Sequence, residues 1–158
     1  MTTTRDVQDF LGLHRIAMVG VSRDPKDFSR KLFQEMCDRG YDMVPVNRVA
    51  TEIDDRECVQ CLQAIRPAVE GVLVMTPAYE TIRIVKDCAE AGIHKVWIYR
   101  AGGTGAVSDE AVAFCKQNGM QVVEGHCPFM FFPRTGFVHR AHGFLLKITH
   151  GYPLAPAA

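Results

Sequence analysis

A glycine- and serine-rich segment early in the chain has the residue types that bind a phosphate group. Residues 16–19 are an apolar run, Gly20, Ser22 and Pro25 follow, and Ser29 opens a pattern with helical spacing. When a strand is followed by a tight loop and the first turn of a helix, backbone N–H groups and the positive end of the helix are directed toward one place. The segment therefore predicts a phosphate site. We expect its ligands in the loop and first helical turn: Gly20, Val21, Ser22, Arg23, Lys26, Ser29 and Arg30.

The next strand end indicates which nucleotide carries that phosphate. A dinucleotide fingerprint would need glycine at positions 20, 22 and 25, and only Gly20 is present. A protein that binds NAD also carries a carboxylate for the ribose at the end of its second strand. Here that place holds Asn47 and Arg48. A cation there favours a nucleotide with an extra phosphate on its ribose, and both NADP and coenzyme A fit.

Apolar runs and helical patterns alternate along the chain. Strands are predicted at 15–20, 42–46, 71–75, 95–99 and 121–124. Helices are predicted at 29–39, 56–65, 78–91 and 107–118, after a short first helical segment that ends at Leu13. Strands that are apolar throughout imply a parallel sheet covered on both faces. With right-handed crossovers the fold is then α/β, a doubly wound three-layer sandwich.

The expected strand order, 3-2-1-4-5, decides which loops meet. Ligands of open parallel sheets bind outside the carboxyl ends of the strands, where the order reverses. In this order the reversal lies between the first and fourth strands, which brings together the loops 20–30 and 99–106. Arg100 and Gly102 of the second loop therefore join the predicted site.

Several segments resemble the small CoA-binding domain family, stand-alone relatives of the CoA-binding domain of succinyl-CoA synthetase alpha subunits. The matching segments are 16–22 with Pro25 and Ser29, 40–47, 95–98, and 119–124 with Cys127, within residues 12–128. The resemblance implies a Rossmann-like fold in which Gly20, Val21 and Ser22 wrap the phosphates of CoA. It also implies that Asn47 and Arg48 lie near the adenosine, and that Thr76 and Pro77 form the neighbouring loop.

The chain departs from the family pattern at two places. Pro25 is followed by Lys26 and Asp27 where the family has a basic pair, so we expect Lys26 to supply that charge. The loop at 99–105, which follows the fourth strand, is longer and richer in glycine than the family's turn there. This loop lies at the pantetheine end of the site that the resemblance implies.

Length and composition indicate the number of domains and the kinds of partner that the protein has. We expect 158 residues to form one domain, with a core at about 12–128 and an aromatic and basic extension at 129–158. Lys plus Arg and Asp plus Glu both total 18, which gives no electrostatic case for nucleic acid or an anionic membrane as partner. Without an apolar leader or span, we expect a cytoplasmic protein with six reduced, mostly buried cysteines.

Other chemistry-bearing residues are interpreted as structural. Cys58 and Cys61 would share one helix face, which favours packing over a metal site. His126 and Cys127 are a nucleophile and base in type, but no third residue orients them; we expect Cys127 to pack and His126 to be solvated. A cluster of His139, His142 and His150 on a closing helix at 136–148 lacks a further ligand. We predict no metal and no catalytic residue.

The sequence favours non-covalent binding of CoA or an acyl-CoA. Two alternatives stay open: an NADP-linked reductase acting at 102–105, and a redox regulator that forms a mixed disulfide between CoA and a cysteine such as Cys127. The phenylalanines near the C-terminus either cover the sheet edge or bury in a homodimer, and the homodimer is favoured. They are Phe129, Phe131, Phe132, Phe137 and Phe144.

Overall fold

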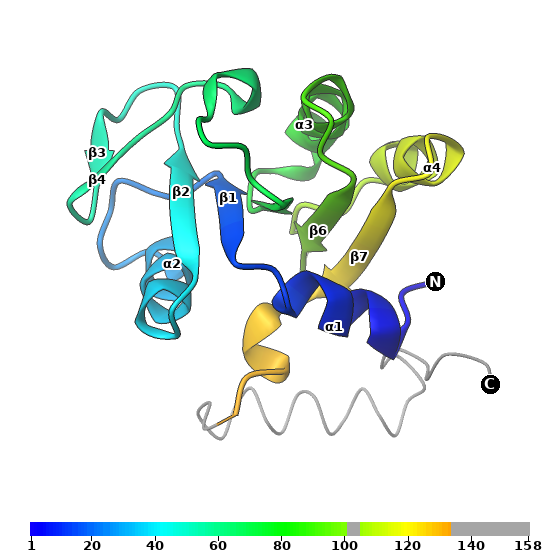
Figure 1. Ribbon diagram of the computed structural model, residues 1–158, viewed down its shortest axis with the longest axis horizontal. Coiled ribbons are helices and arrows are strands. Elements are labelled where there is room, and N and C mark those ends of the chain that lie inside the picture. The colour runs from blue at the N-terminus through cyan, green and yellow to red at the C-terminus, as the bar shows by residue number, and fades with distance from the viewer. Residues whose placement is uncertain (101–104, 134–158) are drawn as a thin grey trace.

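Five parallel strands form a sheet at the centre of the protein (Figure 1). The computed structural model describes residues 1–100 and 105–133. The strands are β1 (Arg15–Val19), β2 (Asp42–Val46), β5 (Gly71–Val74), β6 (Lys95–Tyr99) and β7 (Gln121–His126). Every neighbouring pair in this sheet is parallel, which confirms the predicted α/β sheet.

The strand order differs from the prediction. It is β2-β1-β5-β6-β7, so the third predicted strand, β5, lies beside β1 and not beside β2. Both orders satisfy right-handed crossovers and buried strands, and the apolar pattern cannot choose between them. The order therefore reverses between β1 and β5. The loops that follow these two strands meet there, and the loop after β6 starts one strand further away.

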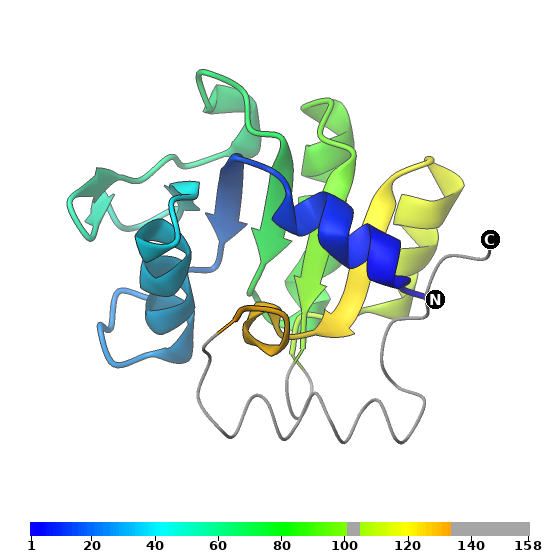
Figure 2. The same cartoon turned by 60° about the horizontal axis from the view of Figure 1, so that its bottom comes forward.

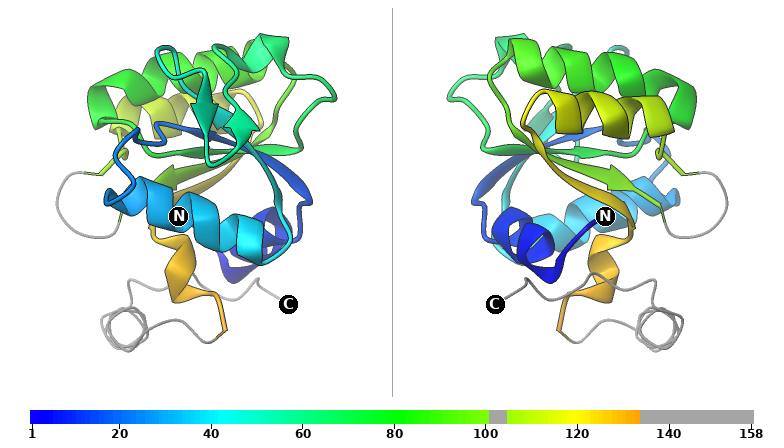
Figure 3. Two further views of the ribbon diagram at one scale, coloured as in Figure 1. Left: turned by 90° about the vertical axis from the view of Figure 1, so that its left-hand side faces the viewer. Right: turned by 90° about the vertical axis from the view of Figure 1, so that its right-hand side faces the viewer.

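Helices cover both faces of the sheet (Figure 3). Helices α1 (Thr4–Leu11) and α2 (Phe28–Asp38) lie on one face, and α3 (Ala78–Glu90) and α4 (Asp109–Gln117) lie on the other. Figure 2 shows α1 lying across β6 and β7. Each face buries its own apolar cluster, one around Trp97 and Phe33, the other around Val72 and Ile84. This is the predicted three-layer sandwich.

A hairpin and a short turn replace the helix predicted at 56–65. Strands β3 (Glu52–Ile53) and β4 (Arg56–Glu57) pair antiparallel, and a 3-10 turn, η1, spans Leu62–Ala64. Asp54 and Asp55, with φ of 49° and 59°, form the two-residue turn. Cys58 is consequently buried and Cys61 exposed, so the prediction of a shared helix face was wrong.

The described chain ends with a second 3-10 turn, η2 (Pro128–Met130), below the sheet. Phe132 is buried there, and the guanidinium of Arg39 lies over its ring at 4.4 Å. Phe137, Phe144, the three C-terminal histidines, the helix predicted at 136–148 and Gly102 lie outside the described residues. No helix in the described part of the chain is both long and apolar enough to cross a membrane.

Candidate ligand-binding site

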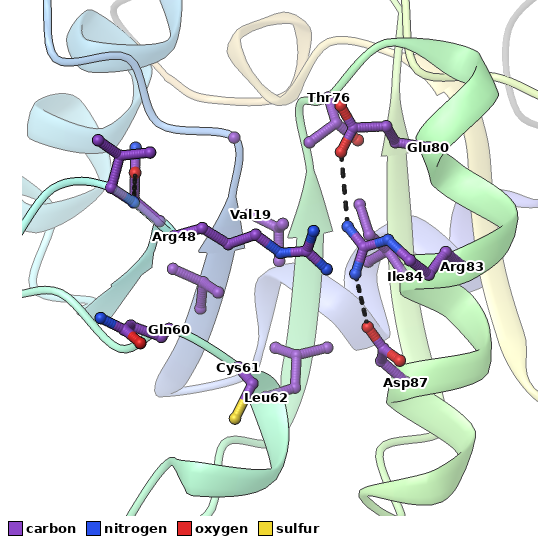
Figure 4. A pocket seen from close by; sticks show the side chains of 14 residues that line it. Val19, Arg48, Gln60, Cys61, Leu62, Thr76, Glu80, Arg83, Ile84 and Asp87 are labelled. Atoms are coloured by element: carbon purple, nitrogen blue, oxygen red, sulfur yellow. Dashed lines mark hydrogen bonds and ion pairs between the residues drawn. The ribbon is translucent and has the colours of Figure 1, made fainter.

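A cavity of about 290 Å³ lies at the carboxyl ends of β1 and β2, on the side of the sheet that α3 covers (Figure 4). It therefore adjoins the point where the strand order reverses, the usual ligand position in this class of sheet. The residues that line it are Val19, Gly20, Val46, Asn47, Arg48, Val49, Gln60, Cys61, Leu62, Thr76, Glu80, Arg83, Ile84 and Asp87.

The cavity has an apolar floor and a polar rim. Val19, Val46, Leu62 and Ile84 are buried and belong to the α3-side core. Charged and amide side chains surround this floor, from the segment after β2 on one side and from α3 on the other. An apolar base with a few polar groups above it is suited to a flat heterocycle with polar substituents.

Gly20 brings two loops into contact at the reversal point. Its φ is +94°, and a Cβ built there would lie 2.8 Å from the Thr76 backbone nitrogen and 2.9 Å from Thr76 Cγ2. The Met75 N–H donates to the Val19 carbonyl at 2.8 Å just beside it. Only glycine combines this conformation with so close an approach, so Gly20 fixes the wall between the β1–α2 and β5–α3 loops.

Asn47 shapes the segment that carries Arg48. Its side-chain amide donates to the Val21 carbonyl at 3.1 Å, and its Oδ1 accepts from the N–H groups of Val49 and Ala50 at 2.8 and 2.9 Å. These bonds hold the turn after β2 against the β1–α2 loop. In this arrangement Asn47 is a positioning residue for Arg48.

Arg48 reaches from the end of β2 toward α3, with its guanidinium facing that of Arg83 (Figure 4). Among the described residues, Arg48 forms no hydrogen bond or ion pair. On α3, Arg83 donates to Asp87 at 3.0 Å and to Glu80 at 3.5 Å. As far as the described chain shows, the cavity thus presents the unpaired cation of Arg48 opposite Arg83, a cation that two carboxylates hold.

The predicted phosphate loop bonds largely to itself. The Ser22 N–H donates to Ser29 Oγ at 2.9 Å, and the Ser29 N–H donates to Asp27 Oδ1 at 2.8 Å. Asp27 caps α2, so a carboxylate of the chain already occupies the positive end of that helix. Lys26 is exposed beside this cap. Gly20 and the adjoining Thr76 remain the part of the loop region that faces the cavity.

Arg30 braces the loop from the first turn of α2. It forms an ion pair with Asp54 at the tip of the β3–β4 hairpin, and it donates to the carbonyls of Ser22 and Arg23 at 3.3 and 3.2 Å. Its guanidinium therefore links the hairpin to the loop, a role that needs the same charge that the sequence suggested for phosphate binding.

The structure brings together four of the predicted site residues: Gly20, Asn47, Arg48 and Thr76 line the cavity. Val21 is buried beneath the loop, and Pro77 stands exposed at the N-cap of α3. Ser22, Arg23, Lys26, Ser29 and Arg30 belong to the loop and first turn of α2 and do not line it. Arg100 follows β6, two strands from β1.

The α3 wall and the segment at Gln60 and Cys61 also line the cavity and were not predicted from the sequence. Glu80, Arg83 and Asp87 stand at i, i+3 and i+7, which places them on one side of a helix. That spacing was available in the sequence. Only the position of α3 beside the end of β2 turns this polar stripe into a cavity wall.

Cys127 and His126, the nucleophile and base in type, are both buried. Burial raises the pKa of Cys127 to about 11, and this thiol is 1% exposed. His126 is buried against Phe131, and its carbonyl accepts from Trp97 Nε1 at 2.9 Å; its predicted solvation was wrong. Within residues 1–100 and 105–133, no group of three or more His, Cys, Asp or Glu residues is placed to hold a metal ion.

The family model for the CoA binding domain matches residues 14–133, and the chain belongs to this family. Among curated proteins it is similar to the YneT protein of Bacillus subtilis, with 27% identity over 113 residues, which is 72% of this chain and 81% of that one.

Solved structures share the fold. A hypothetical protein from Pyrococcus horikoshii superposes with a TM-score of 0.74 at 24% identity, over 91% of this chain and 92% of that one. A dinucleotide-forming acetyl-coenzyme A synthetase from Candidatus Korarchaeum cryptofilum superposes with a TM-score of 0.65 at 21% identity, over 75% of this chain and 27% of the synthetase. These neighbours support the Rossmann-like class.

Proposed function

We propose that this protein binds coenzyme A, free or acylated, without a covalent bond and without catalysis of its own. Membership of the CoA binding domain family supports a CoA-related ligand. The observation that carries the proposal is the Arg48 guanidinium, unpaired among the described residues, in a cavity at the end of β2. A cation in that place suits a ribose phosphate, which CoA has and NAD lacks.

The size of the cavity supports partial enclosure of the ligand. Whole small-molecule pockets measure roughly 300–1,000 Å³, and this cavity measures about 290 Å³. It has room for the adenosine end of CoA and not for the entire molecule. In the proposed pose the adenine covers the apolar floor, the ribose phosphate lies beside Arg48, and the pyrophosphate crosses Gly20.

The remaining predicted ligands act further along the same molecule. Val21, Ser22 and Arg23 follow Gly20 in the loop, and we propose that they border the pyrophosphate; Lys26, Ser29 and Arg30 come later in the loop and in the first turn of α2. Thr76 and Pro77 are proposed to border the other side of the pyrophosphate. The Thr76 hydroxyl is buried and has no hydrogen-bond partner in the described part of the chain, so it has bonding capacity left for a ligand. Arg100 and Gly102 are proposed for the pantetheine end.

A binding role without catalysis is supported by the residues around the cavity. Among the described residues, the lining includes no histidine. The acetyl-coenzyme A synthetase with the same fold is a much longer chain, of which this protein matches 27%. The proposal for this domain is therefore ligand binding alone. A cytoplasmic location and a homodimer remain predictions.

NADP is the second candidate ligand, because Arg48 suits its ribose phosphate as well. An NADP-linked reductase would need its reactive end near residues 102–105, which come after β6 in the sequence. The regulator that forms a mixed disulfide is disfavoured at Cys127, because that thiol is buried and its pKa is raised.

Calorimetric titration of the purified protein with CoA and with NADPH tests the proposal. We expect CoA to bind one to one, and NADPH to bind at least tenfold more weakly. Tighter binding of NADPH would replace the proposal with the second candidate. No binding of either cofactor would refute both.

A further inference from the structure

We propose that Arg83 is a second phosphate-binding residue, and that the cavity selects a ribose phosphomonoester by holding it between Arg48 and Arg83. The inference rests on the proposed function, because it names the group of CoA that this cavity recognises. It concerns a residue on α3, outside the loops that the sequence pattern identified.

Arg83 is held in place before any ligand arrives. Its Nη1 donates to Asp87 Oδ2 at 3.0 Å, and its Nη2 donates to Glu80 Oε2 at 3.5 Å. These partners stand one turn after and one turn before it on α3. A guanidinium has five N–H donors, and two of them serve these bonds. Three donors therefore remain for a ligand, on a side chain that is 41% exposed.

Arg48 approaches the same space from the opposite wall. Figure 4 shows its extended side chain crossing toward α3, with the two guanidinium groups facing each other. Within the described residues no carboxylate pairs with Arg48. Two like charges that face each other repel, and a dianion between them turns that repulsion into two attractive contacts. A phosphomonoester carries close to two negative charges at neutral pH.

The carboxylates of Glu80 and Asp87 restrict which anions can bind in the cavity. Arg48, Arg83, Glu80 and Asp87 together carry no net charge, so the cavity does not attract anions in general. An anion gains only where it contacts the guanidinium groups, and the carboxylates beside them are acceptors for hydroxyl groups. A phosphorylated ribose offers a dianion and a neighbouring hydroxyl on one ring. CoA carries this arrangement at its adenosine end, whereas dephospho-CoA has a hydroxyl in place of the phosphate.

Arg83→Gln tests the inference, with Lys86→Gln as the matched control. Lys86 is exposed, lies on the same helix, does not line the cavity, and loses the same charge when it is substituted. The readout is the ratio of the dissociation constants for CoA and dephospho-CoA, measured by calorimetry. We expect Arg83→Gln to weaken CoA binding about ten- to a hundredfold, as for a lost charged hydrogen bond. Dephospho-CoA binding, and both ligands with Lys86→Gln, should change less than about threefold.

Each outcome separates the inference from the proposed function. Equal weakening of both ligands by Arg83→Gln, or no weakening, would overturn the phosphate role of Arg83 while wild-type CoA binding stands. Wild-type protein that binds no CoA would refute the proposed function and the inference with it. If Arg83→Gln unfolds, Arg83→Lys decides: it keeps the charge and loses the planar fork. For Arg83→Lys we expect a weaker preference for CoA over dephospho-CoA than in the wild type. An unchanged ratio of the two dissociation constants would contradict the inference.

Discussion

Replacing Gly20 with alanine should damage both the fold and the cavity. Gly20 has a φ of +94°, and an added Cβ would meet the Thr76 nitrogen at 2.8 Å and the Met75 carbonyl carbon at 3.0 Å. Both atoms belong to the backbone of the β5–α3 loop, so no side-chain rotation relieves the contact. The two loops at the reversal point must separate.

The cost divides into two parts. A non-glycine residue in the left-handed region costs about 1–2 kcal/mol, and overpacking of a tight contact costs about 1–3 kcal/mol. Gly20→Ala should therefore lower the free energy of unfolding by about 2–5 kcal/mol. Gly40 provides the control: its φ is +93°, and a Cβ there would meet nothing within 4 Å. Gly40→Ala should therefore lower the free energy of unfolding only by the cost of the left-handed backbone, about 1–2 kcal/mol.

Urea denaturation of both variants and calorimetry with CoA measure these effects. Near the midpoint, 1 kcal/mol shifts the melting temperature by about 2–4 °C in a domain of this size, so melting curves provide a second reading. Gly20→Ala should also weaken CoA binding at least tenfold, whereas Gly40→Ala should leave it unchanged. Equal losses of stability in the two variants would refute the steric argument, and unchanged CoA affinity in Gly20→Ala would remove Gly20 from the site.

Three further perturbations probe the site and the sheet. Arg48→Glu should greatly weaken CoA binding and weaken dephospho-CoA binding less, measured by calorimetry; equal losses would exclude Arg48 from the phosphate site. Iodoacetamide at pH 8 should alkylate Cys61 first, because it is the exposed thiol of the six; peptide mass spectrometry should show that CoA slows the reaction and Cys61→Ser abolishes it. Burial opposes ionisation of Asp42, but hydrogen bonds from Arg15 and Arg56 outweigh it and hold the pKa of this carboxyl below its usual value. The stability that Asp42 contributes should be present above about pH 4 and lost as the pH falls through its lowered pKa. The stability difference between wild type and Asp42→Asn should then shrink, and a constant difference in acid denaturation would contradict this.

The parallel sheet was predictable because its strands carry continuous apolar runs between glycine-ended helices. Met18 and Leu73, both fully buried, illustrate why such runs reveal burial and not neighbours: each reads the same in any strand order. The order of the sheet depends on whether β5 pairs with β1 or with β2, and no local pattern encodes that choice. The predicted reversal therefore lay between β1 and β6, whereas the order reverses between β1 and β5.

The same limit explains which site residues could be found. Gly20 and Arg48 stand at strand ends, where chain position alone predicts their neighbourhood. Arg83 lies on a helix, and its relation to Arg48 depends on the packing of α3 beside the end of β2. The hairpin at 52–57 had a local signal in Asp54 and Asp55, a polar pair able to adopt positive φ. The apolar spacing of residues 58–65 is also typical of a helix, so a helix was predicted at 56–65 and the hairpin was not.

A crystal structure of the protein with CoA would show whether the adenosine end of the ligand lies in the cavity beside Arg48. In that complex we expect the adenine over Val19 and Val46, the ribose phosphate in contact with Arg48, and the pyrophosphate beside Gly20. Adenosine bound elsewhere on the molecule, or a bound CoA whose ribose phosphate points away from Arg48 into solvent, would contradict it.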